Sequence, residues 1–148
     1  MKIRKVKPED CKDIWIWRND FSSRKMFKNN KLISWSDHLK WFSKCLKDEK
    51  CFIYIGYLSK PINIGIVRFN INQSGNSASV SLNINPEFRK LGFGTQILKK
   101  SILEFKKIHD ITLIAEVFSE NIPSIKCFNK SGFNQIEIKN DLLILIKN

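Results

Sequence analysis

One short stretch, Asn85-Pro86-Glu87-Phe88-Arg89-Lys90-Leu91-Gly92-Phe93-Gly94-Thr95, separates a predicted strand at 78–85 from a predicted helix at 94–108. Gly92 and Gly94 allow the backbone to approach a ligand closely, and each can adopt positive φ at little cost. Successive N–H groups and the positive end of the following helix form a cradle for an anion. Arg89 and Lys90 add positive charge at its rim. The stretch therefore predicts a diphosphate site, although an ordinary strand–helix turn can also contain a glycine pair.

The patterns on either side predict one mixed α/β domain over residues 1–148. Strands are expected at 2–6, 51–58, 62–71, 78–85, 112–117, 133–138 and 142–146. Helices are expected from Pro8 through the segment that carries Ile14 to Arg18, from an N-cap at Ser34 to 47, at 94–108 and at 123–130, with a polar connection at 20–33. This order predicts a mixed sheet with helices packed on its faces.

The charge of the chain favours a small anionic partner over a nucleic acid. The formal net charge is +12, but only five of the 26 basic residues are arginine, the residue that dominates specific base readout. The lysines are spread through every segment rather than gathered in one stripe. We therefore expect no nucleic-acid partner, whereas the positive field favours an anionic small molecule.

Cysteine usage and hydropathy predict a cytoplasmic protein. Cys11, Cys45, Cys51 and Cys127 form no C-x-x-C pair and have no histidine at ligand spacing, so reduced thiols are expected, without a disulfide framework or a bound metal. No apolar run approaches the roughly 18 residues that a membrane span needs. The basic N-terminus lacks the apolar stretch of a signal peptide. No membrane partner is expected.

Two blocks resemble the GNAT superfamily of N-acetyltransferases. The segment 89–94, Arg-Lys-Leu-Gly-Phe-Gly, resembles the Arg/Gln-x-x-Gly-x-Gly/Ala signature that wraps the pyrophosphate of acetyl-CoA in that family. Downstream, Asn121-Ile122-Pro123-Ser124 and Phe128-Asn129-Lys130-Ser131-Gly132-Phe133 resemble its Asn-x-x-Ala…Tyr-x-Lys-x-Gly-Phe block, and Gly65 stands where the family's middle strand usually has glycine. The resemblance covers 62–133 and implies the GNAT fold, a mostly antiparallel mixed sheet of about seven strands flanked by four helices.

The resemblance implies acetyl-CoA as acetyl donor. The strands at 78–85 and 112–117 would splay, the pantetheine arm would lie between them, and the backbone N–H of Ile84 would stabilise the oxyanion. Asn121 would reach the pantetheine amides, and Lys130 the adenosine phosphate end. The implied cofactor set is Leu82, Asn83, Ile84, Arg89, Lys90, Leu91, Gly92, Phe93, Gly94, Thr95, Asn121, Ser124, Phe128 and Lys130.

One residue departs from the family's pattern. The usual general acid is a tyrosine at the position of Phe128, which has no proton to donate. Loss of a positioned proton donor typically costs about 10²–10⁴-fold in rate. Ser124, Ser131 and ordered water are alternative acids, and a thiol with a pKa of about 8.5 can also leave unaided as thiolate.

The acceptor site is expected in the N-terminal helices. Ile14-Trp15-Ile16-Trp17-Arg18-Asn19 and the segment 33–42 resemble the N-acetyltransferases of the pseudaminic-acid pathway, which acetylate an amino group on a UDP-linked deoxy sugar. This implies a UDP-amino sugar as acceptor, with His38 as a candidate base. Core packing of the tryptophans and of His38, and a surface ion pair for Arg18, are the structural alternatives. The implied acceptor set is Trp17, Arg18, Asn19, Arg24, Met26 and His38.

The absence of a carboxylate that could act as general base bears on which kind of amine is acetylated. The strand before the glycine stretch offers Ser79, Ser81 and Asn83 but no carboxylate. An amine beside electronegative carbons has a pKa of about 7.7–8.0, against about 10.4 for lysine, so a sugar amine or a peptide N-terminus is favoured. A sugar-nucleotide N-acetyltransferase, a peptide or protein N-terminal (ribosomal-protein-type) or other small-amine acetyltransferase, and a non-catalytic CoA-binding module stay open. Monomer and homodimer both stay open.

Overall fold

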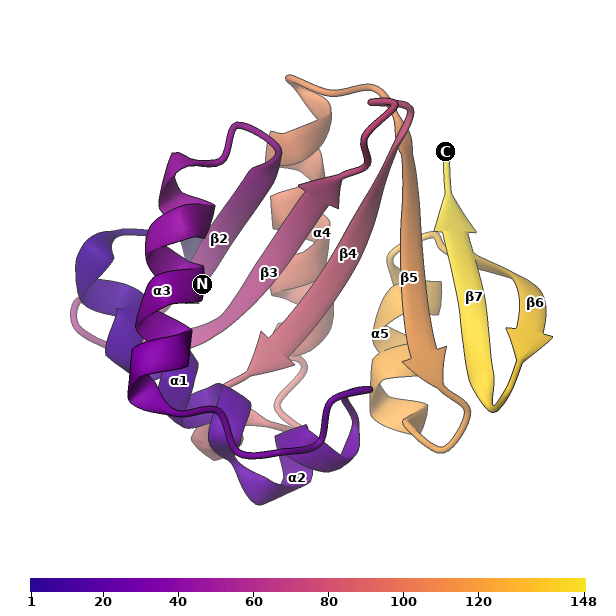
Figure 1. Cartoon of the computed structure of the whole chain (residues 1–148). Coiled ribbons are helices and arrows are strands. Elements are labelled where there is room, and N and C mark those ends of the chain that lie inside the picture. The colour runs from indigo at the N-terminus through magenta and orange to yellow at the C-terminus, as the bar shows by residue number, and fades with distance from the viewer.

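The structure, a computed structural model that describes residues 1–148, is built on one seven-stranded sheet with helices on both faces (Figure 1). The helices are α1 (Cys11–Asn19), α2 (Phe21–Lys25), α3 (Trp35–Lys47), α4 (Phe93–Lys106) and α5 (Ile122–Lys130), with 3₁₀ turns at Pro8–Asp10 and Pro86–Phe88. No helix combines the length and the apolar character that crossing a membrane requires. The strands are β1 (Lys2–Lys5), β2 (Cys51–Tyr57), β3 (Asn63–Ile71), β4 (Ser77–Ile84), β5 (Thr112–Phe118), β6 (Asn134–Lys139) and β7 (Leu142–Lys147).

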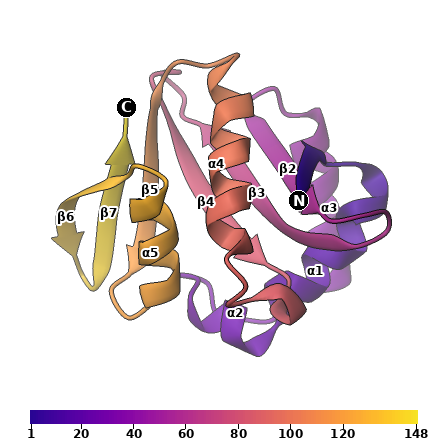
Figure 2. The same ribbon diagram turned by 180° about the vertical axis from the view of Figure 1, so that it is seen from behind.

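The strand order is β1-β2-β3-β4-β5-β7-β6. Every neighbouring pair is antiparallel except β4 and β5, so the predicted mixed, mostly antiparallel sheet is confirmed. Helices α1 and α3 cover one face, and α4 and α5 cover the other, as the views from the two sides show (Figures 1 and 2). The parallel pair β4–β5 therefore lies in the middle of the sheet.

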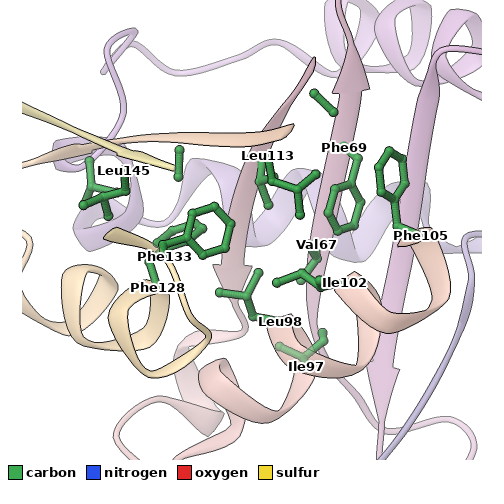
Figure 3. Close-up of a cluster of buried hydrophobic side chains, with 14 of the residues drawn as sticks. Val67, Phe69, Ile97, Leu98, Ile102, Phe105, Leu113, Phe128, Phe133 and Leu145 are labelled. Carbon is green, nitrogen blue, oxygen red and sulfur yellow. The ribbon is translucent and has the colours of Figure 1, made fainter. Parts of the chain in front are cut away.

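The main core lies between the sheet and the α4 and α5 layer (Figure 3). Four apolar side chains of α4 are buried there: Ile97, Leu98, Ile102 and Phe105. The ring of Phe105 stacks on that of Phe69 in β3, with centroids 4.3 Å apart. Each such fully buried side chain contributes about 1.5–3 kcal/mol to the free energy of folding. This packing fixes α4, and with it the turn that precedes α4.

Two sequence expectations are wrong in this part of the chain. The connection at 20–33 contains α2, because the Asp20 side chain accepts the backbone N–H of Ser23 and so caps a short helix. Cys45 and Cys51 form a disulfide instead of remaining reduced, because the turn after α3 brings their Cα atoms to 5.6 Å. Cys11 and Cys127 are free thiols.

Gly65 allows a close approach between β3 and β4. A Cβ atom there would lie 2.6 Å from the Asn83 carbonyl oxygen and 3.0 Å from the Ile84 Cα, which are backbone atoms. A Cβ atom at Gly56 on β2 would instead meet the flexible end of the Ile97 side chain. This contrast makes the two glycines a matched pair for a stability test.

Gly65→Ala should lower the free energy of unfolding by about 1–3 kcal/mol, because overpacking against backbone cannot relax. Gly56→Ala should cost less, because the Ile97 side chain can change its rotamer. Chemical denaturation of both variants measures the difference. A Gly65→Ala variant as stable as the wild-type protein would contradict the close β3–β4 approach.

Candidate functional site

Strands β4 and β5 pair at only three positions, the last of which joins Ser79 and Ile114. Beyond this point they diverge toward their carboxyl ends, which is visible as a widening gap (Figure 1). The splay expected from the sequence is therefore confirmed. It leaves one side of β4 without a strand partner over the rest of its length.

The backbone of Leu82 and Ile84 faces this gap. Asn85 donates its N–H to the carbonyl of Ile64 on β3 at 2.8 Å. In an antiparallel pair the residues that alternate with a bonded one turn their N–H and C=O groups to the other side. Ile84 and Leu82 therefore turn their backbone groups toward β5, in the part of β4 that no longer pairs with β5. An extended ligand can add there as a strand.

Gly92 gives the glycine stretch an open backbone. It is the N-cap of α4 with φ of +79°, and a Cβ atom there would have no neighbour within 4 Å. Lys90 also has positive φ, +63°, and is exposed. Leu91 is exposed, whereas Phe93 and Thr95 belong to the first turn of α4. The turn is thus accessible to a ligand at the positive end of a 14-residue helix.

Gly94 has a different role from the one expected. Positive φ is possible for both glycines of the stretch, but only Gly92 has it. A Cβ atom at Gly94 would lie 2.9 Å from Cys127 Sγ and 3.7 Å from side-chain atoms of Leu82 and Ile84. Gly94 therefore allows α4, α5 and the end of β4 to approach one another.

Arg89 is held by protein groups, in contrast to the mobile rim charge expected from the sequence. Its Nη1 lies 2.9 Å from Asp20 Oδ2, its Nη2 donates to Ser23 Oγ at 2.6 Å, and its Nε donates to the Ile84 carbonyl at 3.1 Å. Burial raises the pKa of Asp20, but hydrogen bonds from Ser23 and Arg89 outweigh this and leave that pKa below its ordinary value. Ser23 also donates to Asn83 Oδ1 at 3.2 Å. The network ties α2 to the end of β4.

The α5 residues divide between capping, packing and exposure. Asn121 caps α5 by accepting the Ser124 N–H at 3.3 Å, and Lys130 is exposed. Phe128 is 2% exposed and packs edge-on against Phe133, so its ring belongs to the core (Figure 3). The alternative acid Ser131 is buried and donates its hydroxyl to the Cys127 carbonyl. Ser124 is the one of the two serines whose hydroxyl has no hydrogen bond in the protein.

A cavity of about 570 Å³ opens beside the gap, on the α1 and α3 face of the sheet. Its walls come from α1, the connection after α2, α3 and strands β3, β4 and β5, and they include Leu82 and Asn83. Four charged side chains line it: Arg18, Lys28, Arg68 and Glu116. Glu116 forms an ion pair with Lys28. The cavity therefore has excess positive charge and lies against the same strand as the gap.

Half of the acceptor residues expected from the sequence line this cavity, namely Arg18, Met26 and His38. Trp17 is 4% exposed and belongs to the core under α1 and α3. Asn19 exchanges two hydrogen bonds, both of 2.9 Å, with the backbone of Ile33. Arg24 donates to the carbonyls of Asn19 and Asn30. Asn19 and Arg24 thus hold the 26–33 connection in place, and none of the three residues lines the cavity.

His38 is part of the cavity wall and is 2% exposed. Its Nε2 lies 2.8 Å from the Cys11 carbonyl oxygen, so this nitrogen carries the proton and donates. Burial lowers the pKa of His38, and the hydrogen bond to Cys11 offsets this only in part. Only Nδ1 is left to accept a proton.

Arg68 and Glu116 were missed by the sequence analysis. Arg68 lies on β3, where it faces the cavity between buried Val67 and Phe69 that face the main core. The available signal was a single arginine inside the otherwise apolar run 64–69. Glu116 has the same kind of position on β5. No sequence motif on β3 or β5 singled out Arg68 or Glu116. No group of three or more potential metal ligands occurs in the protein.

Several solved structures share this fold over nearly the whole chain. Spermidine N-acetyltransferase from Vibrio cholerae, in complex with CoA and spermine, has a TM-score of 0.86 at 18% identity, covering 99% of this chain and 94% of that one. Ribosomal-protein-alanine N-acetyltransferase from Brucella melitensis has a TM-score of 0.84 at 18% identity, covering 99% of both. A domain from Methanocaldococcus jannaschii has a TM-score of 0.84 at 20% identity, covering 99% and 97%.

At the level of sequence, no curated protein matches the chain. Residues 1–134 match the acetyltransferase (GNAT) domain family, which extends beyond the glycine stretch and the α5 block to both helical layers. The chain therefore belongs to the GNAT acetyltransferase family, and it is an N-acetyltransferase that takes its acetyl group from acetyl-CoA.

Proposed function

We propose that this enzyme acetylates the amino group of a UDP-linked amino-deoxy sugar. The observation that carries the proposal is the charge of the cavity beside β4, where three cationic side chains face one carboxylate. That carboxylate, Glu116, is already paired with Lys28. A nucleotide diphosphate brings two negative phosphates into such a cavity, and the cationic side chains of the cavity attract these phosphates.

The residues of the gap fit acetyl-CoA. The open turn at Gly92 and the N-terminus of α4 would hold the pyrophosphate, with Lys90 at the rim. The backbone groups of Leu82 would hold the pantetheine arm, and the Ile84 N–H would contact the thioester oxygen, while the Ile84 carbonyl accepts from Arg89. On the α5 side we place Asn121, Ser124 and Lys130. Phe128 would lie beneath these residues, where its buried ring separates them from the main core.

Acetyl-CoA supplies an acetyl thioester, on which the amine nitrogen forms the new C–N bond while the C–S bond breaks and CoA leaves with the amine proton. The chain's own contribution is positioning, since reactants held in a productive geometry gain several orders of magnitude in rate. The cavity has no unpaired carboxylate to act as a base. An amine with a pKa of about 7.7–8.0 does not need one, because roughly a tenth is free base at pH 7.

The related structures point to other acceptors, and the cavity distinguishes among them. A polyamine carries several positive charges, which Arg18, Lys28 and Arg68 would repel. A peptide N-terminus carries one positive charge and has the low pKa that the site requires. It is therefore the second candidate, and its turnover is one arm of the test below.

Gly92→Val should abolish acetyl-CoA binding, because a branched side chain would fill the open turn and resist positive φ. Gly75→Val is the matched control: Gly75 has φ of +75° and equally open surroundings, but lies in the turn between β3 and β4. Both variants should lose similar stability, and calorimetry should find acetyl-CoA affinity lost only in the first. Equal cofactor affinity in both would remove Gly92 from the cofactor site.

His38→Gln should leave kcat close to the wild-type value, because we assign His38 to packing and to the bond with Cys11. If Nδ1 were the base, kcat would instead fall by about 10²–10⁴-fold. Steady-state rates across pH 6–9 separate the outcomes, with a thermal melt to show that the variant is folded. A hundredfold loss in a folded variant would restore His38 as the base.

The acceptor is identified by kinetics with UDP-amino sugars, short peptides of varied N-termini and spermidine. We expect UDP-amino sugars to give the highest kcat/KM, and free UDP to compete with the acceptor but not with acetyl-CoA. Arg18→Ala should raise the KM for the sugar nucleotide about tenfold or more, since charged hydrogen bonds contribute about 1.5–3 kcal/mol. Preferred turnover of a peptide, with Arg18→Ala harmless, would replace the proposal by N-terminal acetylation.

A further inference from the structure

Two arginines of the cavity have donors without partners. Arg18 Nη1 and Arg68 Nε are buried nitrogen atoms with no hydrogen bond. Arg18 Nη2 donates to the Asn29 carbonyl at 2.7 Å, and no carboxylate pairs with either guanidinium. Buried donors are nearly always satisfied in folded proteins, because an unpaired one costs stability. Two of them lining one cavity call for a common explanation.

Aromatic rings hold both guanidinium groups in place. The Arg18 guanidinium lies 3.9 Å above the centroid of Phe27, and that of Arg68 lies 5.2 Å from the centroid of Trp41. Such stacking restricts the long side chains and leaves their donor edges free for a ligand. Arg68 is also directly opposite Ser81 in the β3–β4 register, and that residue lines the cavity too.

The two charges repel each other across the cavity. Burial lowers the pKa of Arg18, and the charges of Arg68 and Arg24 lower it further. Burial also lowers the pKa of Arg68. Glu116 does not relieve this repulsion, because its partner is Lys28. An anion placed between the guanidiniums would satisfy both free donors and remove the repulsion.

We infer that Arg68 and Arg18 together form an anion subsite that binds a phosphate or carboxylate group of the acceptor and so selects acidic amines. Arg68 is the new element, a specificity residue on the sheet itself rather than on the N-terminal helices. The inference deepens the proposed function, since the diphosphate of a sugar nucleotide is one such anion. It also applies to any other amine that carries a negative group.

The direct test is calorimetry with pyrophosphate and with malonate, at constant ionic strength and with saturating CoA to occupy the cofactor's own phosphate site. At least one anion should bind the wild-type protein, and Arg68→Gln should weaken that binding at least tenfold, the usual effect of losing one charged hydrogen bond. Arg68→Lys should retain part of the affinity, because it keeps the charge but loses the bidentate edge. Preference for pyrophosphate identifies a phosphate-bearing acceptor, and preference for malonate a carboxylate-bearing one.

Lys99→Gln is the matched control, since it removes the same unit charge from the exposed side of α4 on the opposite face of the sheet. It should leave anion affinity unchanged. Failure of both anions to bind, or equal binding by folded Arg68→Gln, would overturn the inference. Thermal melts of both Arg68 variants show whether the loss of the Trp41 contact affects folding.

Kinetics separate this inference from the proposed function. Arg68→Gln should raise the KM for acidic amines at nearly constant kcat. It should leave the KM for glucosamine, an amine without an acidic group, unchanged. If UDP-amino sugars are not substrates but another acidic amine shows this Arg68 dependence, the subsite stands and the sugar-nucleotide proposal falls. If UDP-amino sugars are turned over and Arg68→Gln is harmless, the reverse holds.

Discussion

The end of pairing between β4 and β5 is the constraint on which the site depends. Two strands that stop pairing with each other at Ser79 and Ile114 leave unpaired backbone groups in the middle of a sheet, and such groups need partners. A ligand that brings its own amides can supply them. The sheet tolerates this interruption because β5 is held on its other side by six pairs with β7, and β4 by seven pairs with β3.

Arg89 connects this gap to the N-terminal helices. One guanidinium binds the carbonyl of Ile84, the cap residue of α2 and the hydroxyl of Ser23. The residue that begins the family's phosphate-binding signature thus also positions the start of the acceptor wall. Because all three of its guanidinium nitrogens already donate to protein groups, we expect the diphosphate of acetyl-CoA to rely mainly on backbone N–H groups and Lys90, which is the mode of binding that an open glycine turn favours.

The shape of the glycine turn and of α4 could be predicted from the sequence, whereas the side chains that line the cavity could be predicted only in part, for a physical reason. The glycine turn is an arrangement of backbone, and backbone shape leaves a local signature in the sequence, as with Gly92 and the burial pattern of α4. The cavity wall is made of single side chains from elements far apart in the chain. Arg68 can therefore be recognised as a cavity residue only once β3 lies beside α1. Spacing along the sequence alone could not show that Arg18 lines the cavity whereas Trp17 and Asn19 do not.

The same division explains how one fold serves different acceptors. The structures that superimpose at TM-scores of 0.84–0.86 share 18–20% of residues with this chain. A turn and a strand edge built from backbone survive such divergence, because most side chains can change without altering them. The cavity is lined by residues of three strands that face away from the main core, so one substitution at such a residue can change its charge. The sheet itself is unaffected, because the residues that face the core alternate with those that face the cavity. We therefore propose that the charge of that cavity, rather than the fold, selects the acceptor of this enzyme.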